Sequence, residues 1–172
     1  MDAINSDAFL KSDAFLKNDE ANALKEQALQ HRQRWMSVLA HSSPSALLEH
    51  WQPLNLSPTY SLLRPAETGL TQLQGRMGGT GKRFVMGDMT VTRAVIQLSS
   101  GVYGYSYVRG RDKQHAELCA VIDALLQVSG MEELLHKRVI APLAASQQAQ
   151  RERRARQIAS SRVDFFTLVR GE

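Results

Sequence analysis

The chain has almost no cysteine and no long apolar run. Cys119 is the single cysteine among 172 residues, so an internal disulfide cannot form. A transmembrane helix needs about 20 consecutive apolar residues, and the sequence contains neither such a run nor a signal-like segment. We therefore expect a cytoplasmic protein that has no membrane partner.

Common catalytic motifs are missing as well. No Ser-His-Asp or Cys-His spacing is found, and no pair of carboxylates lies within a recognisable site motif. His115-Ala116-Glu117 matches the first half of the zinc-deaminase signature, but the second half, P-C-x-x-C, is absent. His115 and Cys119 can share a helix face, yet two ligands do not make a structural zinc site. We expect no catalytic residue and no metal site, and we interpret Cys119 as a small buried apolar residue.

Length and charge favour a single domain with a basic C-terminal part. A chain with 43% hydrophobic residues can bury a modest core of its own. The formal net charge is +4, and the segment from Lys137 onward holds eight Lys or Arg against three acids. Residues 1–18 contain a tandem copy of SDAFLK that is too short for a solenoid. We interpret them as a variable extension, a slippage product, a poorly ordered segment or an added helical turn, and expect the domain over 19–172.

Helical periodicity precedes the central region of the chain, residues 67–117. Apolar or aromatic residues recur at steps of four and three, and Asn18 or Asp19 can cap the helix that this pattern predicts. Pro44 is well placed in the first turn of a short second helix. The stripe of the first helix is Leu24, Ala28, His31, Trp35 and Val38, and that of the second is Leu47, Leu48 and Trp51.

Helical periodicity also follows the central region. Asp112 can cap a helix that carries Leu118, Val121, Ile122 and Leu125 at helical spacing, with Gly130 as a C-cap beyond its end. Pro142 separates a short apolar run from a last helix over roughly 143–161. That helix has a thin apolar stripe, so we expect it to lean on a partner or on its own domain. The stripe consists of Ala145, Ala149, Ala155 and Ile158.

The region 67–117 is rich in glycine, and short runs of Val, Thr, Tyr and Ile lie between the glycines. Such runs are typical of strands joined by tight turns. We expect strands over 60–64, 70–74, 89–98 and 102–108, with a turn over 65–69. The sequence thus predicts an α+β fold: a small antiparallel β-sheet of about four strands, flanked by N-terminal and C-terminal helices.

Arginines accompany these glycines and suggest contact with an anion. Consecutive N–H groups of the 78–82 loop can form an anion nest with Lys82 and Arg83 beside it, and the alternative is a plain hairpin turn. The loop is not a Walker A motif, because five residues separate Gly75 from Gly81 and Arg83 replaces the Ser or Thr that holds magnesium. Two arginines near 110 can point together if their strand continues that far. The candidate phosphate or substrate contacts are Arg76, Gly78, Gly79, Gly81, Arg93, Arg109 and Arg111.

Three tyrosines alternate along one expected strand. Tyr103, Tyr105 and Tyr107 should project from one face, as the aromatic residues of an RNA-binding RRM do. The match to the RNP1 motif is poor at Gly101 and Ser106. From the residues alone, a small basic RNA-binding module is the alternative function. Its basic residues would be Arg151, Arg153, Arg154 and Arg156.

Longer segments follow one another in an order that is more specific than any of these motifs. RMGGTGKRFVMGDMTVTRA, YVRGRD and AELCAVIDALL precede the closing RVDFFTLVRGE. From about Arg34 to Glu172, the chain resembles the PhnG family, whose members belong to the bacterial carbon–phosphorus lyase core complex. The resemblance implies an accessory, non-catalytic subunit that is required, within a multi-subunit transferase, for displacing the purine of ATP by an alkylphosphonate. It implies no activity of the isolated chain.

The resemblance also implies partners and cofactors. The partners are subunits H, I and J in a hetero-oligomer, and nucleic acid is not expected. ATP is the substrate of the complex, the iron–sulfur cluster belongs to another subunit, and no cofactor is expected on this chain. The last residues are apolar in a way that loose termini are not, so we expect them to dock on a partner. The candidate interface residues are Phe165, Phe166, Leu168, Val169 and Arg170.

Overall fold

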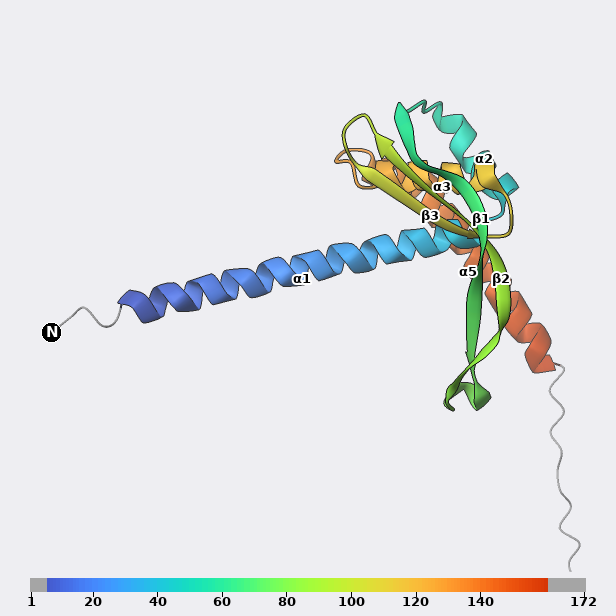
Figure 1. The fold of residues 1–172 in the computed structure, drawn as a ribbon, viewed down its shortest axis with the longest axis horizontal. Coiled ribbons are helices and arrows are strands. Elements are labelled where there is room, and N and C mark those ends of the chain that lie inside the picture. Colours follow the sequence, from blue (N-terminus) through green and yellow to red (C-terminus); the bar gives the residue numbers. More distant parts are fainter. Residues whose placement is uncertain (1–5, 161–172) are drawn as a thin grey trace, which may run out of the picture.

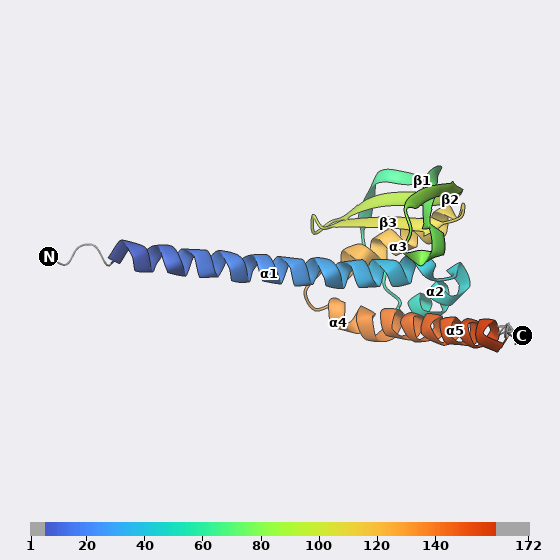
Figure 2. The same cartoon turned by 90° about the horizontal axis from the view of Figure 1, so that it is seen from below.

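The computed structural model describes the backbone of residues 6–160 and the side chains of residues 22–160. A three-stranded sheet is combined with helices from both ends of the chain (Figures 1 and 2). This confirms the predicted α+β class. The strands are β1 (Tyr60–Arg76), β2 (Arg83–Leu98) and β3 (Tyr103–Arg109). The helices are α1 (Ser6–His41), α2 (Pro44–Trp51), α3 (Lys113–Leu125), α4 (Glu132–Leu135) and α5 (Ala141–Ser160), with 3-10 turns at Gln52–Leu54 and Met77–Gly79 and a π-turn at His136–Ile140.

The strands form an antiparallel sheet in the order β1-β2-β3. The two strands expected before residue 75 are one long strand, so the sheet has three strands rather than about four, and the turn expected over 65–69 is wrong. β1 shifts register on both sides of Arg64, between Leu62 and Glu67. Proline is tolerated at bulges and on edge strands, where its missing N–H breaks no ladder bond. Pro65 therefore bends β1 without ending it.

β1 and β2 are much longer than β3. β3 pairs with β2 only from Val91 to Gln97, whereas β1 and β2 stay paired as far as Arg76 and Arg83. The segment 70–89 therefore continues as a two-stranded ribbon, which we call the hairpin arm. Figure 1 shows this arm extending beyond the rest of the sheet, with the turn Met77–Gly79 at its tip.

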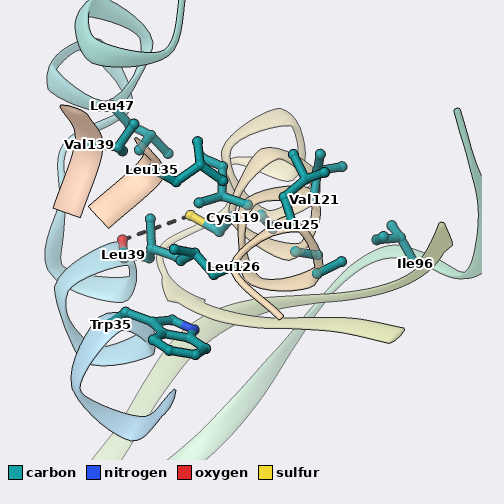
Figure 3. Packing of buried hydrophobic residues seen from close by; sticks show 14 of the residues in the cluster. Trp35, Leu39, Leu47, Ile96, Cys119, Val121, Leu125, Leu126, Leu135 and Val139 are labelled. Atoms are coloured by element: carbon teal, nitrogen blue, oxygen red, sulfur yellow. Dashed lines mark hydrogen bonds between the residues drawn. The ribbon is translucent and has the colours of Figure 1, made fainter. Parts of the chain in front are cut away.

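The core lies between one face of the sheet and the helices, as Figure 3 shows. Asp112 caps α3 as predicted, since its carboxylate accepts a hydrogen bond from the His115 backbone N–H at 2.9 Å. Gly130 is not the C-cap of α3, because Leu126 has that position and Gly130 lies in the turn before α4 with a φ of +88°. Ser43 caps α2. The largest fully buried side chains include Leu47, Ile96, Ile122, Leu126 and Leu135.

Helix α1 begins at Ser6 rather than at Asn18 or Asp19. No glycine or proline interrupts the sequence from there to His41, so the helix contains both copies of the repeat. Within its described side chains, from residue 22 onward, the last turns pack on the body: Trp35 and Leu39 are buried, whereas Leu24 is exposed. The predicted apolar stripe is thus confirmed near its C-terminal end and wrong at its start.

Helix α5 follows the π-turn directly, because Pro142 is tolerated in a first helical turn. The break expected at Pro142 is therefore absent. Leu143 is buried, and the Gln147 Nε2 group donates a hydrogen bond to the Val38 carbonyl of α1 at 2.8 Å. This contact turns the expected stripe outward, so it does not face the chain's own described domain, and its contact with a partner stays a prediction. The residues of this stripe, all of them exposed, are Ala145, Ala149, Ala155 and Ile158. None of the helices within 6–160 is long and apolar enough to cross a bilayer.

Helix α3 approaches the β3 backbone closely at Gly104. A Cβ atom there would collide with the Ala120 carbonyl oxygen and would lie 2.8 Å from the Ala124 Cβ. Both neighbours belong to the helix core and cannot swing away. Glycine thus sets the distance between α3 and the sheet.

Gly104→Ala should lower the free energy of unfolding by about 1–3 kcal/mol, because α3 must move off the sheet to admit the methyl group. Gly69→Ala is the matched control, since nothing lies within 4 Å of its Cβ position. Urea unfolding measures both variants. Equal stability of the two would show that the helix is not held at this contact distance.

Candidate functional site

The face of the sheet opposite α3, which we call the outer face, carries no helix among the described residues (Figure 2). Along β3 the side chains alternate between exposed and buried. Tyr103, Tyr105 and Tyr107 lie on the outer face, as the sequence predicts. Their cross-strand partners on β2 are Gln97, Val95 and Arg93. Antiparallel partners share a face, so these residues form one surface.

Glu67 is the centre of a charged network on this surface. It accepts a hydrogen bond from Arg93 Nε at 2.6 Å, and it forms an ion pair with Arg64, whose Nε lies 3.0 Å from the same carboxylate. Arg93 also donates from Nη1 to the Tyr107 hydroxyl at 3.4 Å. The hydrogen bond to Tyr107, and then the bond and charge of Glu67, raise the pKa of Arg93. Two guanidinium groups share one carboxylate, so the network keeps a net positive charge.

Arg109 and Arg111 do not lie on one strand face. β3 ends at Arg109, and Gly110 follows with a φ of +104°, which turns the chain away. Arg109 lies opposite Val91 on the outer face and makes no ion pair or hydrogen bond within the described region. The condition for a joint anion contact, a strand that continues to Arg111, is therefore not met. Arg109 remains a candidate on the outer face by itself.

The other candidates lie at the far tip of the hairpin arm. Arg76 is nine residues beyond Glu67 on β1, which corresponds to roughly 30 Å of extended strand. Gly78 and Gly79 have φ values of +60° and +81°, and the Gly81 N–H donates to the Met77 carbonyl at 2.8 Å. This is the geometry of a hairpin turn. Four of the seven candidates thus lie at the arm tip and two on the outer face, while Arg111 follows the end of β3. Contact with phosphate stays a prediction.

A buried carboxylate, which the sequence patterns did not reveal, connects three elements. Asp123 of α3 is fully buried and accepts hydrogen bonds from Arg32 Nη2 at 2.7 Å and from Trp35 Nε1 at 2.9 Å, both on α1. It also accepts from the Tyr105 backbone N–H of β3 at 3.0 Å and from Gln127. The available signal was an acid inside the apolar run CAVIDALL. Acids in such a position are almost always paired.

This cluster positions part of the outer face. Arg32 lies over the Tyr105 ring, with its guanidinium carbon 5.5 Å from the ring centroid. Gln127 donates to the Tyr103 carbonyl at 2.9 Å. Two of the three tyrosines are therefore fixed by groups that also hold Asp123. The face presents aromatic rings, hydroxyls and guanidinium groups, which can bind an anion or the surface of another protein.

His115 and Cys119 are buried beneath α1. Burial lowers the pKa of His115 and raises the pKa of the Cys119 thiol to about 12. Figure 3 shows the thiol directed at the Leu39 carbonyl, at 3.8 Å. A thiol that stays protonated is a poor nucleophile. Cys119 is thus the small buried residue that was predicted.

The sequence that builds this surface matches known proteins. The family model described as "Phosphonate metabolism protein PhnG" matches residues 30–171. The chain belongs to the PhnG family. A curated relative from Rhizobium meliloti (strain 1021) is 37% identical over 157 residues, which cover 90% of this chain and 98% of the relative. That relative is named alpha-D-ribose 1-methylphosphonate 5-triphosphate synthase subunit PhnG.

The PhnG match has a clear extent on the structure. It includes the whole sheet, the hairpin arm and α2 to α5, and it begins inside α1. The tandem SDAFLK repeat lies before the match, in residues 1–18, which we interpret from the sequence as a variable extension. The candidate interface residues Phe165, Phe166, Leu168, Val169 and Arg170 lie outside the described residues, so their docking stays a prediction.

Asp123→Ala should lower the free energy of unfolding by about 3–5 kcal/mol, because it leaves Arg32 and the N–H donors of Trp35 and Tyr105 without their acceptor. Glu117→Ala, on the same helix and outside this cluster, should change it by no more than about 0.5 kcal/mol. Denaturant unfolding followed by tryptophan fluorescence measures both. A loss below about 1 kcal/mol for Asp123→Ala would mean that the cluster does not hold the elements together.

Proposed function

We propose that this chain acts as the PhnG subunit of an alpha-D-ribose 1-methylphosphonate 5-triphosphate synthase in phosphonate metabolism. The observation that carries the proposal is the 37% identity, which extends over 98% of a relative with that name. The family match over residues 30–171 agrees with it. The chain is then one subunit of a multi-subunit transferase rather than an enzyme by itself.

In the finer proposal, this subunit assembles with subunits H, I and J, and the complex displaces the purine of ATP by an alkylphosphonate. ATP is a substrate of the complex, and this subunit holds no cofactor of its own. In this proposal, the iron–sulfur cluster also belongs to another subunit. The single cysteine of this chain supports that assignment, because such clusters are held by several cysteine thiolates. The role of this subunit is to complete the assembly.

RNA binding is the alternative function. The exposed tyrosines of β3 and the exposed arginines of α5 favour it. Against it, Arg32 already lies on the Tyr105 ring, and Arg93 already bonds the Tyr107 hydroxyl. Glu67 also places a carboxylate on the face that the RNA backbone would approach. The outer face therefore fits a protein surface better than a base-stacking platform.

Deleting residues 163–172 should abolish co-purification with the other synthase subunits while the sheet stays folded. Two Phe, one Leu and one Val, if fully buried, contribute about 6–12 kcal/mol of transfer free energy before ordering costs. The measurement is affinity co-purification of tagged complex, with synthesis of the 5-triphosphate product from ATP and methylphosphonate as the activity readout. Circular dichroism of the truncated chain serves as the control for folding.

A second arm of this experiment tests the alternative. Binding of the full chain to a labelled single-stranded RNA is measured by anisotropy at rising salt, because an RNA binder loses affinity steeply as counterions accumulate. We expect only weak, nonspecific retention. Normal assembly of the truncated chain together with tight RNA binding at physiological salt would show that the proposed function is wrong.

A further inference from the structure

The hairpin arm has no support from the rest of the described chain. Beyond the pair Val91–Arg109, β2 has no second strand beside it within residues 6–160, and the arm there is a ribbon of two strands. Figure 1 shows that it projects from the body. An isolated two-stranded hairpin is at best marginally stable in water. A ribbon of this length therefore needs a surface to lie on.

The arm exposes large apolar side chains to solvent. Leu70 is 71% exposed, Met86 67% and Val85 55%, and Phe84 and Leu73 are also exposed. Large apolar side chains gathered on one exposed element mark a site of protein contact. The family match covers every one of them.

Gly75 shapes one side of this apolar surface. A Cβ atom there would lie 2.5 Å from the Met86 Sδ atom and 3.5 Å from the Phe84 ring. Met86 and Phe84 thus lie over Gly75, from the opposite strand, and form a ridge across the arm. Methionine adapts its shape to a partner, which suits an interface.

The tip of the arm carries unpaired positive charge. Arg76 and Arg83 are direct cross-strand partners, and Lys82 precedes Arg83. None of the three has an ion pair within residues 22–160, and Asp88 is the single acid of the segment 70–89. Like charges directly opposite each other destabilise a strand pair. Carboxylates from outside the described chain would therefore stabilise the tip.

We propose that the hairpin arm inserts into an apolar groove of another subunit of the synthase, where carboxylates pair with Arg76 and Arg83. This inference rests on the proposed function, because it requires a heterologous subunit. The ridge of Phe84 and Met86 fills the groove, and the charged tip fixes the direction of insertion. A second copy of this chain fits less well, because its own arm brings the same three cations.

The test measures binding of the purified full chain to the assembled remaining synthase subunits. Phe84→Ser combined with Met86→Ser should weaken binding at least about tenfold, since buried aromatic anchors dominate interfaces. Leu24→Ser is the matched control: it is 66% exposed, but lies before the family match. Both changes are at exposed positions, so the melting temperature should remain that of the unchanged chain.

Charge is tested separately, so that the result does not depend on the apolar variant. Arg83→Glu should also weaken binding about tenfold at low salt. At higher salt, the affinities of this variant and of the unchanged chain should become more similar, because salt screens the charges. Lys25→Glu, on α1 before the matched region, is the control and should bind normally. Binding is measured by calorimetry at two salt concentrations.

Each outcome has a definite meaning. If the unchanged chain assembles and the arm variants bind equally well, the arm inference is wrong and the proposed function stands. If the unchanged chain does not bind the other subunits, the arm inference and the proposed function are both wrong. If the chain forms a homodimer that the arm variants lose, the arm is a self-association surface, and the heterologous groove is ruled out.

Discussion

The structure depends on one buried carboxylate. Asp123 receives hydrogen bonds from α1, through Arg32 and Trp35, and from the backbone of β3, through Tyr105. The N–H of an edge strand would otherwise be left open for pairing with another chain. Because Asp123 of α3 accepts the Tyr105 N–H, this group is no longer free to pair with another chain. The same carboxylate holds α1 beside the β3 edge. The cost of burying a charge is offset only because every donor is supplied by the fold.

The described chain therefore consists of a packed body and of surfaces that no other element covers. Gly104 lets α3 lie against β3, and the helices cover one face of the sheet. The outer face, the hairpin arm and much of α5 remain exposed in the described chain. A rigid body that offers several exposed surfaces suits a subunit, because surfaces held in place lose little freedom when a partner binds. The family match over these same elements agrees with such a role.

Local features of the sequence predict local structure well. The Asp112 cap, the helix after it and the alternation of Tyr103, Tyr105 and Tyr107 were all readable, because neighbouring residues determine them. The long β1 was not, since cross-strand pairing with β2 carries the chain through Pro65. The orientation of α5 depends on Gln147 meeting α1, a contact between residues 109 positions apart.

The candidate site shows the same limit. The exposed tyrosines and the position of Arg109 follow from strand periodicity. The distance between the candidates at the arm tip and those on the outer face does not, because it depends on the length of the β1–β2 pairing. The Asp123 cluster requires three elements to meet and has no local pattern beyond an acid in an apolar run.

Amide hydrogen exchange of the chain, alone and in the assembled synthase, tests the central claim most directly. The claim is that the body is complete by itself and the arm is completed by a partner. We predict that the Tyr105 amide and α3 are equally protected in both states, while amides of residues 70–89 exchange fast in the free chain and slowly in the complex. Equal exchange of the arm in both states would contradict the account.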